Sequence, residues 1–251
     1  MTDTPEKTSS APTSAKKRRV RASSGEPQGK ATPFYGRRKG KKLRSFQSGL
    51  MEELLPHVRL DLSAPFDQQA MFGAGQRDLW MEIGFGGGEH LVAEAASHRD
   101  VDFIGCEPFV NGLAKALALI AADDIGNVRL HNGEAQTVVA ALPAESLAGV
   151  YLLYPDPWPK RRHRKRRFVS DETLAALARA MRKGAELRFA TDIDDYAGWT
   201  LARILRSPHF EWKAQSAQDW LNPWDGWAST RYEEKALREG RTPAYLTFVR
   251  R

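Results

Sequence analysis

With 251 residues, 41% of them hydrophobic, the chain is long enough for one α/β domain with appendages and needs no disulfide or structural metal to build a core. Its single cysteine, Cys106, excludes a disulfide framework, and the lack of a membrane-length apolar run or secretory signal predicts a cytoplasmic protein with no membrane partner. The net charge of +7 favours a polyanionic partner, nucleic acid before membrane.

The charge is concentrated near the N-terminus. Residues 1–44 carry thirteen Lys and Arg against three acids, a local net charge of +10, which leaves −3 for residues 45–251 out of the total of +7. Residues 1–32 are rich in Ser, Thr, Pro, Ala and Lys/Arg without apolar periodicity, so we predict a disordered basic arm. Residues 33–75 are predicted to form a basic extension with a short helix around Gln47–Leu55, and residues 76–251 the main domain.

A strand–helix alternation begins at Leu79. The predicted strands are Leu79–Ile83, Val101–Cys106, Asn127–His131, Gly149–Tyr154, Ala185–Ala190, Phe210–Lys213 and Ala244–Val249. The predicted helices are Glu89–Ser97, Asn111–Ala122, Ala135–Leu142, Asp171–Arg182 and Asp195–Leu205, with Asp171 expected to cap the fourth. This order predicts an α/β fold with a doubly wound, mostly parallel seven-stranded sheet, in which ligands bind at the carboxyl ends of the strands.

The first strand runs into the segment Glu82-Ile-Gly-Phe-Gly-Gly-Gly-Glu-His90. Glycines at 84, 86 and 88 allow a tight strand-to-helix turn and close approach of a ligand to the backbone. A dinucleotide fingerprint would place its third glycine at position 89, where this chain has a glutamate, and a negative charge there disfavours a pyrophosphate. Glu82 suits a ligand that carries an ammonium group.

Acidic residues end the next three strands as well. Glu107 ends the second strand, where a carboxylate can accept both hydroxyls of a ribose. Glu134 follows the third strand, where it could accept from an adenine amino group, and Asp156 ends the fourth. Together with Glu82 they predict a rim of carboxylates along one edge of the sheet.

The fourth strand leads into a turn, Tyr154-Pro-Asp-Pro-Trp158, that opens into a polycation. Seven Lys and Arg surround a single His163 at positions 160, 161, 162, 164, 165, 166 and 167. An acid held between two prolines beside such a run indicates a reaction centre next to a phosphate-binding surface; the alternative is a solvated basic helix. Trp158 could stack on a base or on a neighbouring side chain. No His/Cys/Asp grouping has zinc spacing, so no metal is expected.

These motifs carry a family resemblance over roughly residues 34–251. The glycine turn followed by Glu107 resembles the S-adenosylmethionine site of class I methyltransferases, which have a Rossmann-like fold. The run from Pro155 to Arg167, Ala190-Thr-Asp-Ile193 and Ser229-Thr-Arg-Tyr-Glu-Glu-Lys235 are similar to signatures of the bacterial tRNA (guanine-N7)-methyltransferases. The resemblance implies S-adenosyl-L-methionine as cofactor, tRNA as partner, and methylation of guanine 46 in the variable loop.

The resemblance also implies a role for each matching residue. The donor contacts it implies are Glu82, Gly84, Gly86, Gly88, Glu107, Glu134 and Asp156, of which Asp156 is also the catalytic residue. The tRNA contacts it implies are Lys160, Arg162, His163, Arg164, Lys165, Arg166, Arg167, Asp192, Thr230, Arg231, Tyr232 and Glu233. One departure stands out, because the family usually has an aspartate at the third acid and this chain has Glu134.

Two other functions fit parts of the pattern. A methyltransferase for another RNA base or for a protein would keep the donor site, but exocyclic-amine methyltransferases of similar layout usually carry Asn/Asp-Pro-Pro-Tyr/Phe where this chain has Asp-Pro-Trp-Pro. A nonenzymatic RNA-binding module could use the same basic residues, yet it would not need four acids around a glycine turn. No obligate protein partner is indicated, and both a monomer and a homodimer remain open.

Overall fold

A seven-stranded sheet organises the part of the chain that the structure, a computed structural model, describes: residues 1–2, 36, 38–73 and 77–251. Its strands follow the order β3-β2-β1-β4-β5-β7-β6. They are β1 (Asp78–Ile83), β2 (Val101–Cys106), β3 (Val128–His131), β4 (Leu147–Leu153), β5 (Met181–Thr191), β6 (Phe210–Trp212) and β7 (Ala244–Arg250). All pairings among β1 to β5 are parallel, whereas β7 runs antiparallel to β5 and β6. The predicted doubly wound, mostly parallel sheet is confirmed.

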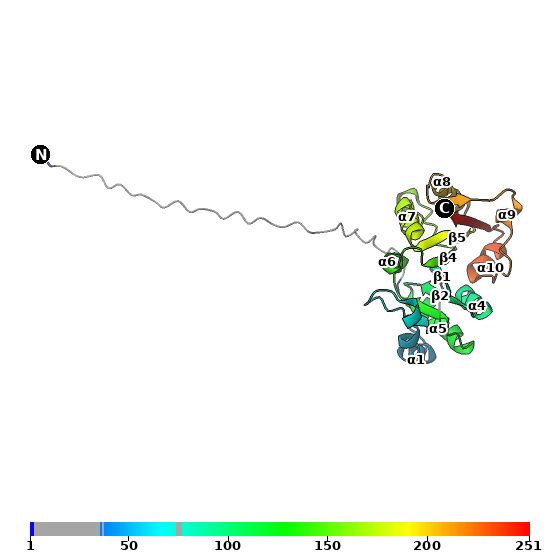
Figure 1. The fold of residues 1–251 in the computed structure, drawn as a ribbon, viewed down its shortest axis with the longest axis horizontal. Coiled ribbons are helices and arrows are strands. Elements are labelled where there is room, and N and C mark those ends of the chain that lie inside the picture. The colour runs from blue at the N-terminus through cyan, green and yellow to red at the C-terminus, as the bar shows by residue number, and fades with distance from the viewer. Residues whose placement is uncertain (3–35, 37, 74–76) are drawn as a thin grey trace. The chain divides into compact units, whose positions relative to one another are not determined.

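Helices cover both faces of the sheet. Figure 1 shows α6 and α7 on one side of the strands and α4 and α10 on the other. The helices after β1 are α4 (Glu89–Ser97), α5 (Val110–Ala122), α6 (Ala135–Ala141), η1 (Arg161–Arg166), α7 (Asp171–Ala180), α8 (Asp194–Ile204), α9 (Gln218–Leu221) and α10 (Arg231–Arg238). The chain passes outward from β1 to β2 and β3 and then crosses back to β4 on the other side of β1. This reversal creates the switch point at which ligands bind in such sheets.

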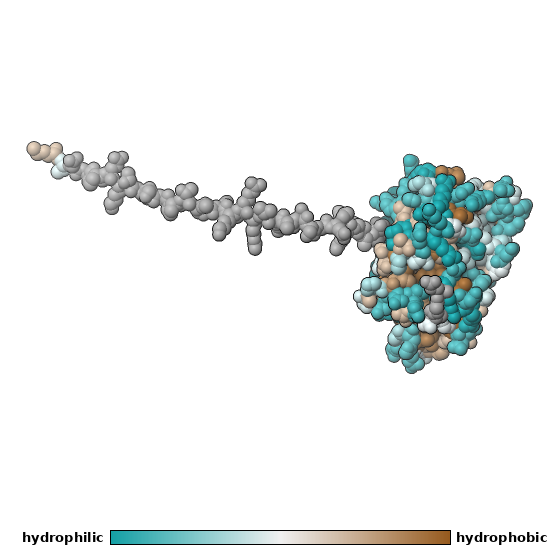
Figure 2. Space-filling model, in the orientation of Figure 1, coloured by the Kyte–Doolittle hydropathy of each residue, from teal (hydrophilic) through white to brown (hydrophobic). Residues whose placement is uncertain are grey.

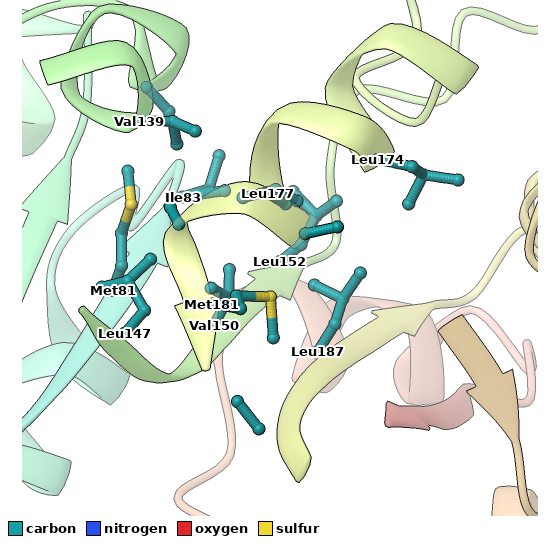
Figure 3. Packing of buried hydrophobic residues seen from close by; sticks show 14 of the residues in the cluster. Met81, Ile83, Val139, Leu147, Val150, Leu152, Leu174, Leu177, Met181 and Leu187 are labelled. Atoms are coloured by element: carbon teal, nitrogen blue, oxygen red, sulfur yellow. The ribbon is translucent and has the colours of Figure 1, made fainter. Parts of the chain in front are cut away.

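Side-chain alternation along the strands builds one hydrophobic core on each face. Figure 3 shows residues of β1, β4 and β5 packing against α6 and α7. The side chains it labels are Met81, Ile83, Val139, Leu147, Val150, Leu152, Leu174, Leu177, Met181 and Leu187. The intervening positions face α4 and α5, where Tyr151 and Leu153 join the second core. Glu82 lies between Met81 and Ile83 in β1 and is therefore directed to the α4 side.

The N-terminal extension packs along the β3 edge and the start of α5. It contains α1 (Ser45–Glu53), α2 (Leu55–Val58) and α3 (Gln68–Phe72). Leu60 donates its N–H to the Leu130 carbonyl at 2.9 Å, which covers part of the β3 edge. The Asn111 side chain accepts from Gly40 N at 2.6 Å and donates to the Lys41 carbonyl at 2.7 Å. The basic segment at 38–41 is thus tied beside the carboxyl end of β2. The predicted disorder of residues 1–32 falls, beyond Met1 and Thr2, outside the described residues.

Two local predictions were wrong. Ser170, not Asp171, caps α7: its backbone is extended and its hydroxyl accepts from Thr173 N at 3.2 Å, whereas Asp171 already lies in the first helical turn. The same helix ends at Ala180 rather than Arg182, because Met181 begins β5 and pairs with Leu147 of β4. The helix α10 was not predicted, although Thr230 and Glu233 have the spacing of a capping box.

The surface is mainly polar on the face that Figure 2 presents, with apolar side chains scattered among hydrophilic ones. Among the described residues, no helix is both long and apolar enough to cross a membrane. Cys106 is 1% exposed, and burial raises the pKa of its thiol, as expected for a structural cysteine.

Candidate active site at the carboxyl ends of the strands

The glycine turn after β1 is held against the start of α5. Gly84, Gly86 and Gly88 have φ values of 74°, 60° and 83°, a left-handed conformation that favours glycine. Gly84 N donates to the Cys106 carbonyl at 2.8 Å, which fastens the turn to β2. A Cβ at Gly112 in α5 would lie 2.1 Å from the Gly86 carbonyl oxygen. Glycine is therefore required on both sides of this contact.

Glu107 links the glycine turn to the start of α5 through its two carboxylate oxygens. Oε2 accepts from Gly86 N and Oε1 from Phe109 N, each at 2.8 Å. Burial raises the pKa of Glu107, the two backbone hydrogen bonds lower it, Asp156 raises it and Arg231 lowers it. Residues from the turn after β1, from the turn after β4 and from α10 thus act on one carboxyl group.

Two further acids of the rim, Glu82 and Glu134, are also engaged within the protein. Glu82 is 3% exposed and accepts from His90 Nδ1 at 2.8 Å. Glu134 immediately precedes α6, and its Oε1 lies 3.7 Å from Arg38 Nη2 in the tied N-terminal segment. The structure therefore places Glu82 inside the α4 side of the sheet and Glu134 at its β3 edge.

Asp156 lies in a strained, exposed turn. Tyr154 and Trp158, on either side of it, have φ values of 48° and 43°, which are uncommon for side chains of this size. Such conformations cost on the order of 1–3 kcal/mol each and persist where the surrounding structure enforces them. The Asp156 side chain is solvent-accessible, yet desolvation by the surrounding protein raises its pKa.

The polycationic run forms η1, and its members differ in environment. Lys160, Arg162 and Lys165 are exposed. The Trp158 ring contacts the run itself, with the Arg166 guanidinium 4.9 Å from its centroid and the His163 ring 6.0 Å away. Desolvation and the neighbouring cations lower the pKa of His163.

Arg167 differs from the rest of the run. Its side chain is fully buried, its Nε donates to the Pro157 carbonyl at 2.8 Å, and its guanidinium pairs with Asp195. Asp195 also accepts from Arg164 Nη2 at 2.6 Å. The tRNA contact implied for Arg167 is therefore not available in this structure, because its guanidinium holds the Asp156 turn against α8.

The C-terminal motif divides into a buried pair and a surface pair. Thr230 caps α10 by accepting from Glu233 N at 3.2 Å, and both residues are buried. Arg231 and Tyr232 instead lie over the glycine turn: a Cβ built at Gly86 would be 3.2 Å from Arg231 Nη2 and 3.3 Å from Tyr232 Cε2. The motif at the far end of the sequence thus meets the turn after β1.

Asp192, at the end of β5, is paired as well. Its Oδ2 accepts from Arg241 Nε at 2.6 Å, and its side chain is 14% exposed. Arg241 escaped prediction, because nothing in its local sequence links it to Asp192. Among the described residues, no group of three or more His, Cys, Asp or Glu could hold a metal ion.

Comparison with known proteins decides the family. A family model described as "Putative methyltransferase" matches residues 76–246. The tRNA (guanine-N(7)-)-methyltransferase of Nitrobacter hamburgensis is 56% identical over 219 residues, which cover 86% of both chains. The protein of the same name from Bradyrhizobium diazoefficiens is 54% identical, and the match covers 86% of this chain and 93% of that one. The one from a Chelativorans species is 50% identical, and the match covers 89% of this chain and 97% of that one.

This chain belongs to the tRNA (guanine-N(7)-)-methyltransferase family. It is an enzyme, not a nonenzymatic RNA-binding module, and its cofactor is S-adenosylmethionine. A variant of 16S rRNA (adenine(1408)-N(1))-methyltransferase from Catenulisporales acidiphilia has the same fold, with a TM-score of 0.50 at 17% identity, covering 74% of this chain and 93% of that one.

The donor-side residues of the methyltransferase fit this cofactor. The glycine turn leaves space for close approach at Gly84, where a Cβ would meet no atom within 4 Å, and Glu107 is placed to accept hydroxyl groups at the end of β2. The acidic Glu82 matches an ammonium group and Glu134 an amino group in chemical character. We propose that Glu107 would hold the ribose, Glu82 the ammonium group and Glu134 the adenine amino group.

The contact between Gly112 and the turn makes a testable prediction. Gly112→Ala should lower the free energy of unfolding by about 1–3 kcal/mol and weaken S-adenosylhomocysteine binding, because the new methyl group displaces the Gly86 carbonyl. Gly126→Ala is the matched control, since no atom lies within 4 Å of its Cβ position. Thermal melting and calorimetry check both variants. Equal stability and equal affinity for the two would contradict the role of this contact.

Proposed function

We propose that the enzyme transfers the methyl group of S-adenosylmethionine to N7 of guanine 46 in the variable loop of tRNA, acting in the cytoplasm. The observation that carries this proposal is the position of Asp156. Asp156 is near enough to Glu107 to raise its pKa, and an exposed basic run begins four residues later, at Lys160. These two neighbours support a role for Asp156 between the donor and the RNA.

The chemistry requires little of the protein beyond placement and charge. When bound, S-adenosylmethionine supplies an electrophilic methyl group on a sulfonium sulfur. Guanine N7 keeps an available lone pair at neutral pH, so no strong base is needed. The methylated base becomes cationic, and the fixed carboxylates of Asp156 and Asp192 would stabilise that developing charge. We assign Asp156 the role of an electrostatic and positioning group, with alignment of the guanine contributing most of the acceleration.

The exposed cations supply the surface for tRNA. Lys160, immediately before η1, and Arg162 and Lys165 within it are exposed, so they can contact phosphates. Arg231 and Tyr232 lie over the glycine turn at Gly86. Arginine is well suited to a guanine edge or a phosphate, and tyrosine to stacking. We propose that these two residues hold the target base against the donor side.

Nucleoside analysis tests the proposed reaction. Bulk tRNA is incubated with the enzyme and donor, digested to nucleosides and examined by mass spectrometry. The expected product is N7-methylguanosine, formed in proportion to enzyme. Another methylated nucleoside, or none despite donor binding in calorimetry, would contradict the proposal.

The basic arm is expected to strengthen tRNA binding without choosing the target. Residues 1–32 contain seven Lys and Arg against three acids, so deleting them should weaken tRNA binding about tenfold at low salt and less at physiological salt, through lost counterion release. A chain with those seven residues replaced by Gln should behave like the deletion, which separates charge from chain length. Salt titrations of the dissociation constant check this, and a change in the modified nucleotide would contradict it.

A further inference from the structure

Glu82 is held by a histidine that the donor-site motif does not explain. His90 lies in the first turn of α4, is 2% exposed, and donates from Nδ1 to Glu82 Oε2 at 2.8 Å. Its Nε2 lies 3.8 Å from Glu94 Oε1, one helical turn further along, and makes no hydrogen bond within the described residues. A buried carboxylate needs such a donor, because a charge without a partner in the interior is costly.

Aromatic rings fix the orientation of this imidazole. The Tyr151 ring meets it edge-on at 4.6 Å between centroids, and the Trp227 ring lies at 4.8 Å. Tyr151 is itself restrained, because its hydroxyl donates to Glu94 Oε2 at 2.8 Å and accepts from Arg188 Nη1 at 3.3 Å. With its plane set by two rings, His90 can present Nδ1 to Glu82 in one direction.

Trp227 extends the same contacts to the C-terminal motif. Its indole N–H donates to Glu233 Oε2 at 2.6 Å, and Glu233 Oε1 accepts from the Tyr245 hydroxyl. Glu233 is 4% exposed and lies in the first turn of α10, next to Arg231 and Tyr232 over the glycine turn. The Trp227 indole therefore contacts both His90, which holds Glu82, and Glu233, which lies beside the residues over Gly86.

We propose that His90 is a positioning residue for the methyl donor and that Trp227 couples it to Glu233, so that the turn after β1 and the start of α10 are set as one unit. This proposal rests on the proposed assignment of Glu82 to the donor's ammonium group. Without the Nδ1–H donor, Glu82 loses the partner that orients its carboxylate, and the ammonium loses a correctly placed counter-charge.

Binding of S-adenosylhomocysteine, which keeps the ammonium group, tests the first half. In calorimetry His90→Leu should weaken binding about tenfold or more, whereas His90→Asn should stay within about threefold of the parent, because its amide nitrogen can replace Nδ1. tRNA affinity should not change in either variant. Equal losses in the two variants, or none in a folded His90→Leu protein, would overturn the positioning role. If His90→Leu does not fold, His90→Phe keeps the ring contacts and should show the same loss.

A double-mutant cycle tests the coupling. Trp227→Phe keeps a ring beside His90 and removes the N–H bond to Glu233. Combined with His90→Leu, it should give a donor affinity that departs at least about threefold from the product of the single effects, as expected for residues in contact. Trp212→Phe is the control and should combine without interaction, because Trp212 is half-buried and packs against the core on the opposite face of the sheet. Independent effects of His90→Leu and Trp227→Phe would refute the coupling.

Glu82→Gln separates failure of this inference from failure of the donor assignment on which it rests. If Glu82→Gln leaves S-adenosylhomocysteine affinity unchanged, Glu82 does not serve the donor and the assignment is wrong. If Glu82→Gln weakens binding while His90→Leu does not, the assignment survives and the positioning role of His90 is wrong.

Discussion

Asp156→Asn should lower kcat about a hundredfold at saturating donor and tRNA, because the variant keeps the shape of the side chain but loses the charge that stabilises the cationic product base. The change should reside in kcat more than in tRNA affinity, since the exposed cations of η1 are untouched. Single-turnover methyl transfer, with binding measured separately, provides the test. Asp123→Asn, an exposed carboxyl at the C-terminal end of α5, is the matched control and should retain full activity.

The pH profile gives the same prediction an independent check. Desolvation raises the pKa of Asp156, so its carboxylate is lost at a higher pH than that of an ordinary aspartate. As pH falls through this raised pKa, kcat of the parent enzyme should fall, and Asp156→Asn should lack that acidic limb. Near-parent turnover by Asp156→Asn, or an unchanged acidic limb, would remove Asp156 from the mechanism.

Glu107→Gln should weaken S-adenosylmethionine binding about ten- to hundredfold. Both carboxylate oxygens of Glu107 accept backbone N–H groups, from Gly86 and Phe109, and an amide can accept only one of them. The substitution therefore places an amide N–H against a backbone N–H and loosens the glycine turn. The expected loss of affinity corresponds to about one to two charge-assisted hydrogen bonds. Calorimetry with the donor measures the effect.

A control at the other end of β2 tests whether the loss of donor affinity is specific to Glu107. Asp100→Asn changes an exposed carboxyl immediately before β2, at the opposite edge of the sheet, and should leave donor affinity unchanged. Because burial raises the pKa of Glu107, donor affinity in the parent should also decline as pH falls through that raised pKa. Donor affinity in Glu107→Gln equal to that of Asp100→Asn would show that Glu107 does not organise the site.

Much of the fold was predictable because apolar runs and turn residues specify strands locally. Val101–Cys106 was predicted with the bounds that the structure shows. The start of β5 was not, because Met181 continues the apolar pattern of α7 and only its pairing with Leu147 makes it a strand. Tertiary pairing there overrides local propensity.

The candidate site also contains some features that could be predicted from the sequence and others that could not. Strand-end acids such as Glu107 could be placed in advance, because parallel strands bring their carboxyl ends to one edge of the sheet. The burial of Arg167 against Asp195 could not, and neither could the contact of His90 with Trp227, which lie far apart in the sequence. Such contacts depend on where loops return to the sheet, which periodicity does not determine.

The most direct test of the whole account is the position of the methyl group. A single tRNA transcript with guanine at position 46 is incubated with the enzyme and donor, and the modified nucleotide is mapped by mass spectrometry of nuclease fragments. We predict N7-methylguanosine at position 46 and no product when that guanine is replaced by adenine. Methylation at another nucleotide, or equal methylation of the adenine-46 transcript, would contradict the account.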